Sequence, residues 1–239
     1  MKKHLLKLST FASMPLVSLA AISCSNNQNI PPRDYEMINN ETGLAFNSEG
    51  EIIKYYYYEG NDCKNIVIPE YLENNRILTS QYYGYKQKIT MIYDNVFSAE
   101  TKYNVDTGKY EPKYNDYAQY LTNITLPNSI ETIGAYAFQE TPLTQIVLPD
   151  SVVDIGFGAF KYCTNLTSIT LLSKKIKYIG VNAFYYSGLE GSLYIPDSVI
   201  QIGSGAFYGT QITEVSIPKT CSYYKTDSFP KGCNVIIRG

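Results

Sequence analysis

Histidine and tryptophan are almost absent from this chain. Its 239 residues include no tryptophan and one histidine, His4, near the amino terminus. Beyond that position the sequence offers no Ser-His-Asp or Cys-His pair and no histidine ligand for a metal ion. No pair of carboxylates stands out by its spacing. We therefore expect a protein that is not an enzyme and that uses no metal and no cofactor.

Charge is also scarce. Charged residues make up 18% of the sequence, and the formal net charge is −2. Lys2, Lys3 and Lys7 are the basic residues of the first 23 positions, so the remainder holds 17 basic against 22 acidic side chains. No segment is basic enough to follow phosphates, which argues against nucleic acid or an anionic lipid surface as partners. With 44% hydrophobic residues, the chain can still bury a core.

One long apolar run is present, and it is short for a membrane span. Residues 8–22 form this run after the positively charged start MKKHLLK, and Pro15 interrupts it. A membrane-spanning helix needs about 20 apolar residues, whereas a secretion signal needs fewer. The sequence predicts a signal peptide at residues 1–23.

The end of the run carries an attachment motif. Residues 21–24 read AISC, and a polar stretch follows. This resembles a bacterial lipobox of the looser kind found in wall-less bacteria, with Ala21 where leucine is usual. The resemblance implies cleavage between Ser23 and Cys24, two acyl chains such as palmitate carried through Cys24, and anchoring on the outer face of the cell membrane. The alternative is ordinary secretion with cleavage after Ala20 or Ala21 and a free thiol at Cys24.

What the chain has in abundance is repetition. Four stretches align in register and read LTNITLPNSIETIGAYAF, LTQIVLPDSVVDIGFGAF, LTSITLLSKKIKYIGVNAF and LEGSLYIPDSVIQIGSGAF. They begin at Leu121, Leu143, Leu166 and Leu189, and a degenerate fifth copy begins at Ile212. Successive starts are 22, 23, 23 and 23 residues apart. A period of this length predicts a solenoid of stacked coils.

Each coil has a readable chemistry. In the first regular copy, Ile124 and Leu126 alternate with Thr125, the pattern of a strand buried on one face. The proline that follows ends the strand because it has no N–H to donate. Gly134 is expected to permit a tight turn that a Cβ would hinder. Phe138 then closes the coil against the core.

An earlier coil is interrupted by insertions. Residues 64–70 (KNIVIPE) match the strand of the repeat, and residues 92–97 (IYDNVF) match its glycine-phenylalanine part. Insertions at about 71–88, which is rich in tyrosine, and 98–120 separate these pieces from the regular array. Inserted loops on a rigid scaffold commonly carry function, so both are candidate binding loops. The alternative is that they are tolerated surface loops.

One triplet inside the second insertion resembles an enzyme motif. Asp106-Thr107-Gly108 has the composition of an aspartic-protease triplet, but it occurs once and follows no buried apolar strand. We interpret it as a turn.

The remaining segments predict the domain organisation. Residues 24–42 are polar and contain proline, which is typical of a tether. Residues 43–62 read as a hairpin that turns at Ser48-Glu49-Gly50 and caps the open end of the core. The solenoid itself is expected at residues 63–239, with its last strand at 235–237.

The repeat pattern identifies a family. L-T-x-I-x-I-P-x-S-V-x-x-I-G-x-x-A-F, over residues 63–239, resembles the BspA-like leucine-rich-repeat proteins. The resemblance implies a mainly β leucine-rich-repeat solenoid of about six coils of 22–24 residues with an N-terminal hairpin cap. It also implies an extracellular or surface-attached protein associated with adhesion and protein binding. The departures from the pattern are Ser173, in a proline place, and the irregular first and last coils.

The cysteines follow the repeat. Cys63, Cys163 and Cys221 fall in register with core positions of other coils, so we expect small core residues rather than a disulfide framework. The alternative is a Cys221–Cys233 pair.

Outward-facing strand residues predict the binding face. Stacking of the coils should arrange them in two ladders: Thr125, Val147, Thr170, Tyr194, Ser216, and beside them Asn123, Gln145, Ser168, Ser192, Glu214. Repeat proteins commonly bind on such surfaces, although any solvated sheet also needs polar ladders. We expect a surface-anchored lipoprotein that displays a repeat domain for protein binding, with adhesion to host surface proteins as one use. The alternative is a structural or accessory envelope protein that contacts the cell's own components.

Overall fold

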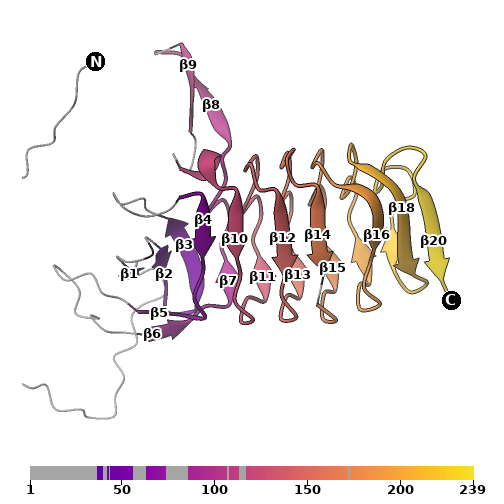
Figure 1. Ribbon diagram of the computed structural model, residues 1–239, viewed down its shortest axis with the longest axis horizontal. Coiled ribbons are helices and arrows are strands. Elements are labelled where there is room, and N and C mark those ends of the chain that lie inside the picture. Colours follow the sequence, from indigo (N-terminus) through magenta and orange to yellow (C-terminus); the bar gives the residue numbers. More distant parts are fainter. Residues whose placement is uncertain are drawn as a thin grey trace, which may run out of the picture.

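The computed structural model describes residues 37–39, 42, 44–55, 63–73, 86–106, 108–112, 117–171 and 173–239. These residues form one row of stacked coils (Figure 1). Each regular coil descends through a front strand, returns through a shorter strand behind it, and crosses to the next coil through turns at the upper edge. The architecture confirms the predicted mainly β solenoid.

The back sheet is continuous. It has nine strands in the order β1-β2-β3-β7-β11-β13-β15-β17-β19. Its strands are β1 (Met37–Asn39), β2 (Leu44–Phe46), β3 (Glu51–Tyr55), β7 (Met91–Ile92), β11 (Thr132–Ile133), β13 (Asp154–Ile155), β15 (Tyr178–Ile179), β17 (Gln201–Ile202) and β19 (Ser222–Tyr223). Pairing is antiparallel from β1 to β3 and parallel from β3 onward.

The front strands are all parallel where they pair, but they form three separate groups. The groups are β4–β10, β12–β14 and β16–β18–β20. Their bounds are β4 (Asn65–Val67), β10 (Asn123–Thr125), β12 (Gln145–Leu148), β14 (Ser168–Leu171), β16 (Glu190–Tyr194), β18 (Gln211–Pro218) and β20 (Asn234–Arg238).

The core between the sheets is built around a column of phenylalanine rings. The ring of Phe138 stacks on that of Phe97 at a centroid distance of 5.4 Å and on that of Phe160 at 5.2 Å. The same stacking continues at 5.1, 5.2 and 5.6 Å through Phe184 and Phe207 to Phe229. The column confirms that residues 92–97 belong to a repeat coil. Since no coil can bury its ring alone, stacking supplies the core.

The recurring glycine has a different role from the one expected. Gly134, Gly156 and Gly180 are absent from the positive-φ positions, so they make no left-handed turn. A Cβ at Gly180 would instead lie 2.6 Å from the backbone of Gly156, and one at Gly156 would lie 2.8 Å from the backbone of Gly134. The glycines therefore permit close approach of successive backbones. The left-handed positions come two residues later, at Tyr136 and Gly158 in the first two regular coils.

The N-terminal cap is an antiparallel hairpin joined to the back sheet. β2 pairs with β3 around a turn at residues 47–50, and β3 then pairs in parallel with β7. The expected tether at 24–42 needs a correction at its end, because β1 is fully inside the cap and Met37 has no exposed surface. Residues 37–39 are too few to show the alternation of apolar and polar residues that predicts a strand. They belong to the sheet because they pair with β2. Most of the tether lies outside the described residues.

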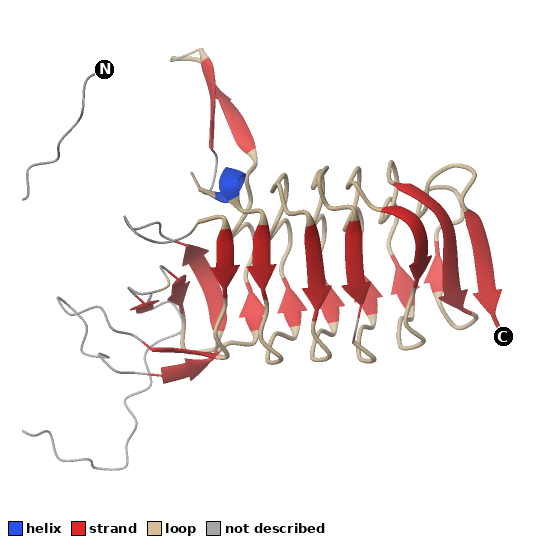
Figure 2. Cartoon of the chain, in the orientation of Figure 1, coloured by secondary structure: helices blue, strands red, loops and turns tan. Residues whose placement is uncertain are grey.

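The two insertions leave the solenoid at opposite edges. β5 (Tyr71–Glu73) and β6 (Lys86–Lys88) pair at the lower edge, and the tyrosine-rich residues 74–85 between them lie outside the described part. β8 (Thr101–Asn104) and β9 (Lys109–Pro112) form a hairpin that projects from the upper edge beside the 3-10 helix η1 (Ala118–Tyr120) (Figure 2). Asp106 lies in the turn of this hairpin, as predicted.

The described cysteines are thiols. Cys163 and Cys221 are buried and Cys163 has no exposed surface, which confirms their core positions. Cys63 and Cys233 are half-buried, so the expectation of a core residue is wrong for Cys63, which lies where the first coil meets the cap. Cys221 and Cys233 are both free. Burial raises the pKa of the Cys163 thiol to about 12.

Candidate functional site

The ten residues predicted for the binding face all lie on the front strands, between inward-pointing aliphatic residues. Eight of them are exposed, whereas Glu214 and Ser216 on β18 are half-buried beneath neighbouring side chains. Between them, Ile124 and Ile146 are buried. Alternation along each strand thus presents one polar and one apolar surface. The front face is exposed to solvent, and most of its outward-facing side chains are uncharged.

The strand register joins these residues only within groups. Gln145 pairs with Ser168, and Val147 with Thr170, on β12 and β14. On β16 and β18, Ser192 pairs with Glu214 and Tyr194 with Ser216, after a bulge between Gly191 and Ser192. Asn123 and Thr125 pair with Asn65 and Val67 on β4 instead of with β12. The two expected ladders are therefore each interrupted twice.

One interruption has a visible cause in the sequence. The segments 166–173 and 189–196, counted from the leading leucine through the proline place, are eight residues long, whereas 121–127 and 143–149 are seven residues long. The extra residue comes at the end of β14, whereas in 189–196 it comes before the outward-facing Ser192 and Tyr194 of β16. The two backbones consequently lose register. Segments 121–127 and 143–149 have equal lengths, and nothing in them explains the interruption between β10 and β12.

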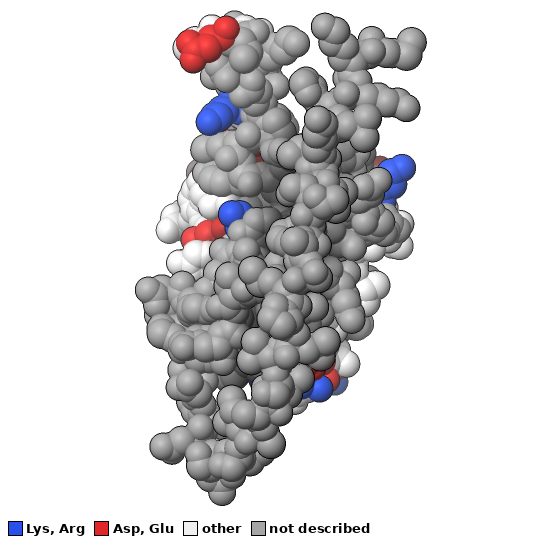
Figure 3. Space-filling view, turned by 90° about the vertical axis from the view of Figure 1, so that its left-hand side faces the viewer, with Lys and Arg blue, Asp and Glu red and all other residues white. Residues whose placement is uncertain are grey.

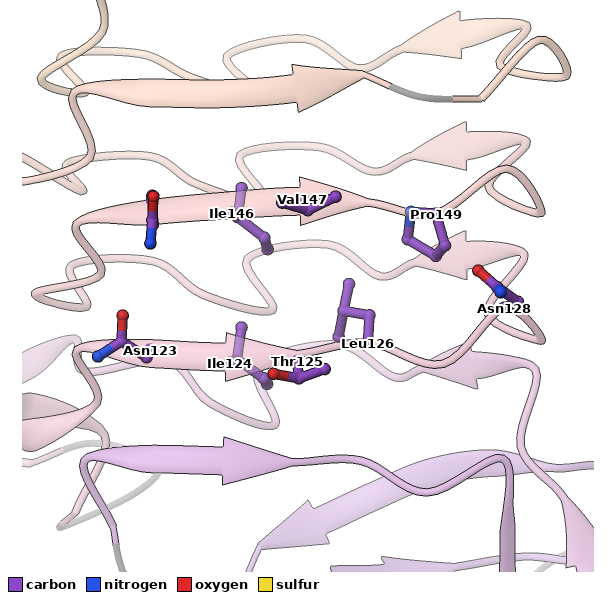
Figure 4. Close-up of a pocket in the computed structure, with 9 residues that line it drawn as sticks. Asn123, Ile124, Thr125, Leu126, Asn128, Ile146, Val147 and Pro149 are labelled. Carbon is purple, nitrogen blue, oxygen red and sulfur yellow. The ribbon is translucent and has the colours of Figure 1, made fainter.

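A groove lies at the first interruption, between β10 and β12. It has a volume of about 320 Å³, and its lining includes the predicted residues Asn123, Thr125, Gln145 and Val147. Figure 4 shows these two neighbouring strands, with Asn128 and Pro149 at the end where each strand turns away. Buried aliphatic side chains form the floor, and amide and hydroxyl groups stand at the rim. An apolar floor with a few polar groups is what a protein side chain or small apolar ligand needs.

A second groove lies at the other interruption, between β14 and β16. It has a volume of about 480 Å³ and is lined by Leu171, Ser173, Lys174, Tyr194, Pro196, Asp197 and Ser198. Ser173 stands in a proline place, and its hydroxyl donates to the backbone carbonyl of Val152 in the previous coil and lies 3.1 Å from that of Asp150. The unusual serine therefore fastens one wall of this groove.

Tyr194, in the other wall, is held by the last strand. The guanidinium of Arg238 lies 4.0 Å from the centre of the Tyr194 ring and 2.6 Å from a carboxylate oxygen of Asp197. It also donates to the Ser216 hydroxyl and to the backbone carbonyl of Ile195. The hydrogen bond from Arg238 holds the pKa of Asp197 below its usual value. The rigid planar guanidinium thus fixes the ring orientation at the edge of the groove.

The sequence reasoning missed both ends of the face. Asn65 and Val67 continue the ladders before β10, and Asn234 and Ile236 continue them after β18. The match of residues 64–70 to the repeat was a sufficient signal for the first pair. Arg238 gave no signal, because it pairs with Pro218 in the preceding coil and no other coil has a basic residue at this place.

The predicted lipid anchor stays a prediction. Cys24 and the Ser23–Cys24 bond lie outside the described residues. In the described part, no helix is long and apolar enough for a membrane crossing, and no histidine, cysteine and carboxylate side chains gather as metal ligands. Figure 3 shows the amino-terminal end of the rod, where the described Lys and Arg side chains in view are separate and form no single patch.

Comparison with known proteins agrees with this architecture. The family described as BspA type Leucine rich repeat region matches residues 112–236 in six copies. The structure is similar to the leucine-rich-repeat protein TpLRR of T. pallidum, with 18% identity, a TM-score of 0.51 and coverage of 84% of this chain and 83% of that one. It is also similar to the pneumococcal vaccine antigen PcpA, with 22% identity, a TM-score of 0.52 and coverage of 78% of this chain and 50% of PcpA. No curated protein matches the sequence. At these identities the two structures show the fold alone.

Proposed function

Because this chain belongs to the BspA-type leucine-rich-repeat family, we propose that it is a lipoprotein that displays its solenoid outside the cell for protein binding. Leucine-rich-repeat domains generally mediate protein interactions, and stacked coils provide an extended rigid surface for them. In this proposal Cys24 is the lipid anchor and adhesion to host surface proteins is the use of the domain.

The observation that carries the proposal is the composition of the front face. Exposed Asn, Gln, Ser, Thr and Val side chains stand there over buried aliphatic residues, and two grooves open between the strand groups. Few charges need to lose their water when a partner covers such a surface, so desolvation costs little. The partner we propose is a folded protein that spans both grooves.

Two further features support display outside the cell. The apolar run at residues 8–22 precedes a cysteine with the spacing of a lipobox. The similar structure PcpA is named a pneumococcal vaccine antigen.

The experiment compares four forms of the full-length chain in the producing cell: wild type, Cys24→Ser, Val147→Arg/Thr170→Arg, and Tyr178→Arg. Val147 and Thr170 are paired exposed residues on the front face, and Tyr178 is an exposed residue of comparable setting on the back sheet. Incorporation of labelled palmitate measures lipidation, membrane fractionation measures anchoring, and surface protease treatment measures exposure outside the cell. Crosslinking of intact cells to host matrix and host-cell surface proteins measures binding.

We expect Cys24→Ser to lose the label and leave the membrane fraction. The front-face double variant should stay anchored but lose at least tenfold in capture, and Tyr178→Arg should behave as wild type. Capture of the cell's own envelope proteins alone would favour a structural or accessory role. Equal capture by the double variant and wild type would exclude the front face as the binding surface.

A further inference from the structure

A cluster of tyrosines lies at the upper edge of the solenoid, away from the front face. It consists of Tyr162, Tyr185, Tyr186 and Tyr208, in the turns that follow the phenylalanine column. The rings belong to three successive coils and contact one another: their centroids are 4.7 Å apart for Tyr185–Tyr186 and 5.6 Å apart for Tyr185–Tyr208. The remaining contacts lie between 5.8 and 6.0 Å. We call these four residues the tyrosine edge.

The rings of the tyrosine edge face solvent. Exposed fractions are 39% for Tyr162, 45% for Tyr186 and 38% for Tyr208, and Tyr185 is half-buried among them. The ring of Tyr186 lies against the backbone of Gly209, because a Cβ on that glycine would come within 2.8 Å of three ring atoms. One face of this ring is thus supported by the next coil, while 45% of the Tyr186 surface stays exposed.

The fold does not require tyrosine at two of these positions. Tyr162 and Tyr186 have left-handed backbones, with φ of 59° and 52°. In the neighbouring coils the equivalent residue is Glu140 or Gly209, also with positive φ. Glycine adopts this conformation without strain, whereas a bulky side chain does not. Bulky residues held in such conformations gather at binding sites, so the two tyrosines are candidates for ligand contact.

The hydroxyl groups of the tyrosine edge are available to a ligand. Within the described ranges, no hydrogen bond or ion pair joins the four phenol oxygens to the protein. Each can donate one hydrogen bond and accept others. The surface therefore combines flat apolar rings with several free hydroxyls, as expected for a ligand that has both apolar C–H faces and many hydroxyls.

Other ligand classes fit less well. A cationic headgroup would compete with the chain itself, since the Nζ of Lys161 lies 5.0 Å from the Tyr162 ring centre and 5.8 Å from that of Tyr185. A proline-rich peptide needs slots between aromatic rings, and rings in mutual contact leave none. A nucleic acid needs a row of basic side chains, whereas among the described residues a single lysine, Lys161, lies over the rings of the tyrosine edge.

We infer that the tyrosine edge binds a neutral saccharide. The C–H face of a pyranose ring stacks on Tyr186 and Tyr162, and its hydroxyls exchange hydrogen bonds with the phenols of Tyr185 and Tyr208. Because the site lies on a different edge from the front face, a glycan and a protein partner can be held together. Saccharide binding at the tyrosine edge is independent of protein binding at the front face.

The test is saturation-transfer NMR on the full-length chain with millimolar maltohexaose, cellohexaose and mannohexaose. Stacking on C–H faces is common to these neutral sugars, so at least one should receive saturation from the aromatic protons. The informative variant is Tyr162→Gly/Tyr186→Gly, which removes two rings while relieving two strained backbones. We expect at least a tenfold loss of affinity with an unchanged or raised Tm. Tyr185→Phe, which keeps the ring and loses the hydroxyl, should weaken binding severalfold.

Two matched controls separate the surfaces. Tyr178→Ala removes an exposed tyrosine of the back sheet, and Val147→Arg/Thr170→Arg changes the front face. Both should bind the sugar as wild type does. No transfer to any of the three sugars, or transfer that persists in Tyr162→Gly/Tyr186→Gly, would overturn the inference. So would binding of decaproline or of phosphatidylcholine vesicles to the tyrosine edge in place of sugar.

Discussion

The two sheets of this solenoid are made by the same coils, yet one is continuous and the other is broken. The back sheet joins nine strands in one unbroken order, and each of its strands from β7 onward is only two residues long. The front strands are mostly longer, but they pair in three groups. Strand length therefore does not determine continuity here.

The difference lies in what adjoins each sheet in the chain. Every back strand of the regular coils is followed by a glycine that lets its backbone lie on the previous coil, and shortly after by a phenylalanine of the stacked column. These two contacts set the spacing and register of the coils. The front strands lie farther along the chain and can hold an extra residue or a bulge. The phenylalanine-glycine side holds the rod together, and the front side is free to vary and to form grooves.

Removing a ring from the column should give the largest effect. Phe184 is fully buried and stacks on both neighbours, so Phe184→Ala should lower the free energy of unfolding by about 3–5 kcal/mol. Val147, on the front face, is 51% exposed, and Val147→Ala should change it by less than about 0.5 kcal/mol. Urea unfolding followed by circular dichroism measures both. Similar costs for the two variants would contradict the assigned difference between the sheets.

Glycine substitutions in the two sheets should change the stability by an intermediate amount. A Cβ at Gly180 would lie 2.6 Å from the backbone of the previous coil, so Gly180→Ala should cost about 2–3 kcal/mol. Gly191, in the front bulge, has φ of 73° and nothing within 4 Å of the position of a Cβ. Gly191→Ala should therefore cost only the backbone strain, about 1 kcal/mol. Thermal unfolding of the two variants checks the order, and a reversed order would show that close stacking is not the controlling contact.

The smallest effect concerns one aspartate on each side. Burial raises the pKa of Asp154 on the back sheet above its usual value, whereas the hydrogen bond from Arg238 lowers the pKa of Asp197 on the front. A raised carboxyl pKa means that the folded state is favoured by protonation, so stability declines as the pH rises through that pKa. A lowered pKa means that stability is present above the unfolded pKa of 3.8 and is lost as the pH falls through the folded value.

The two substitutions should thus have opposite signs. At pH 7, Asp154→Asn should raise Tm slightly and Asp197→Asn should lower it. Both differences from wild type should shrink toward zero below pH 3.8. Differential scanning calorimetry from pH 3 to 7 measures this, and differences of the same sign in the two variants would refute the assignment of burial to one site and an ion pair to the other.

Much of the fold is predictable because the pattern of one coil depends on residues that lie close together in the sequence. The alternation at Ile124 and Leu126, the position of Phe138 and the spacing of the copies predict strands, core and stacking without knowledge of distant contacts. The same alternation predicts the residues of the candidate face, and all ten lie on the front strands, while their role in binding stays a prediction. The hairpin at residues 44–55 also showed its turn in the sequence.

Other features depended on contacts between coils. The role of Gly134 was misassigned because a backbone lying directly against it comes from a different coil. Met37 looked like part of a tether, since only its neighbour strands bury it. Arg238 becomes informative only when β20 brings it over Tyr194, 44 positions earlier in the chain.

The sequence by itself determined the repeat and the buried side of each strand, because these depend on local periodicity and composition. Only the tertiary structure decided where the front strands separate into groups, where the grooves open and which tyrosines meet at the upper edge. Those outcomes depend on the relative register of whole coils: segments 166–173 and 189–196 have equal lengths, yet their extra residues lie at different places and β14 and β16 do not pair.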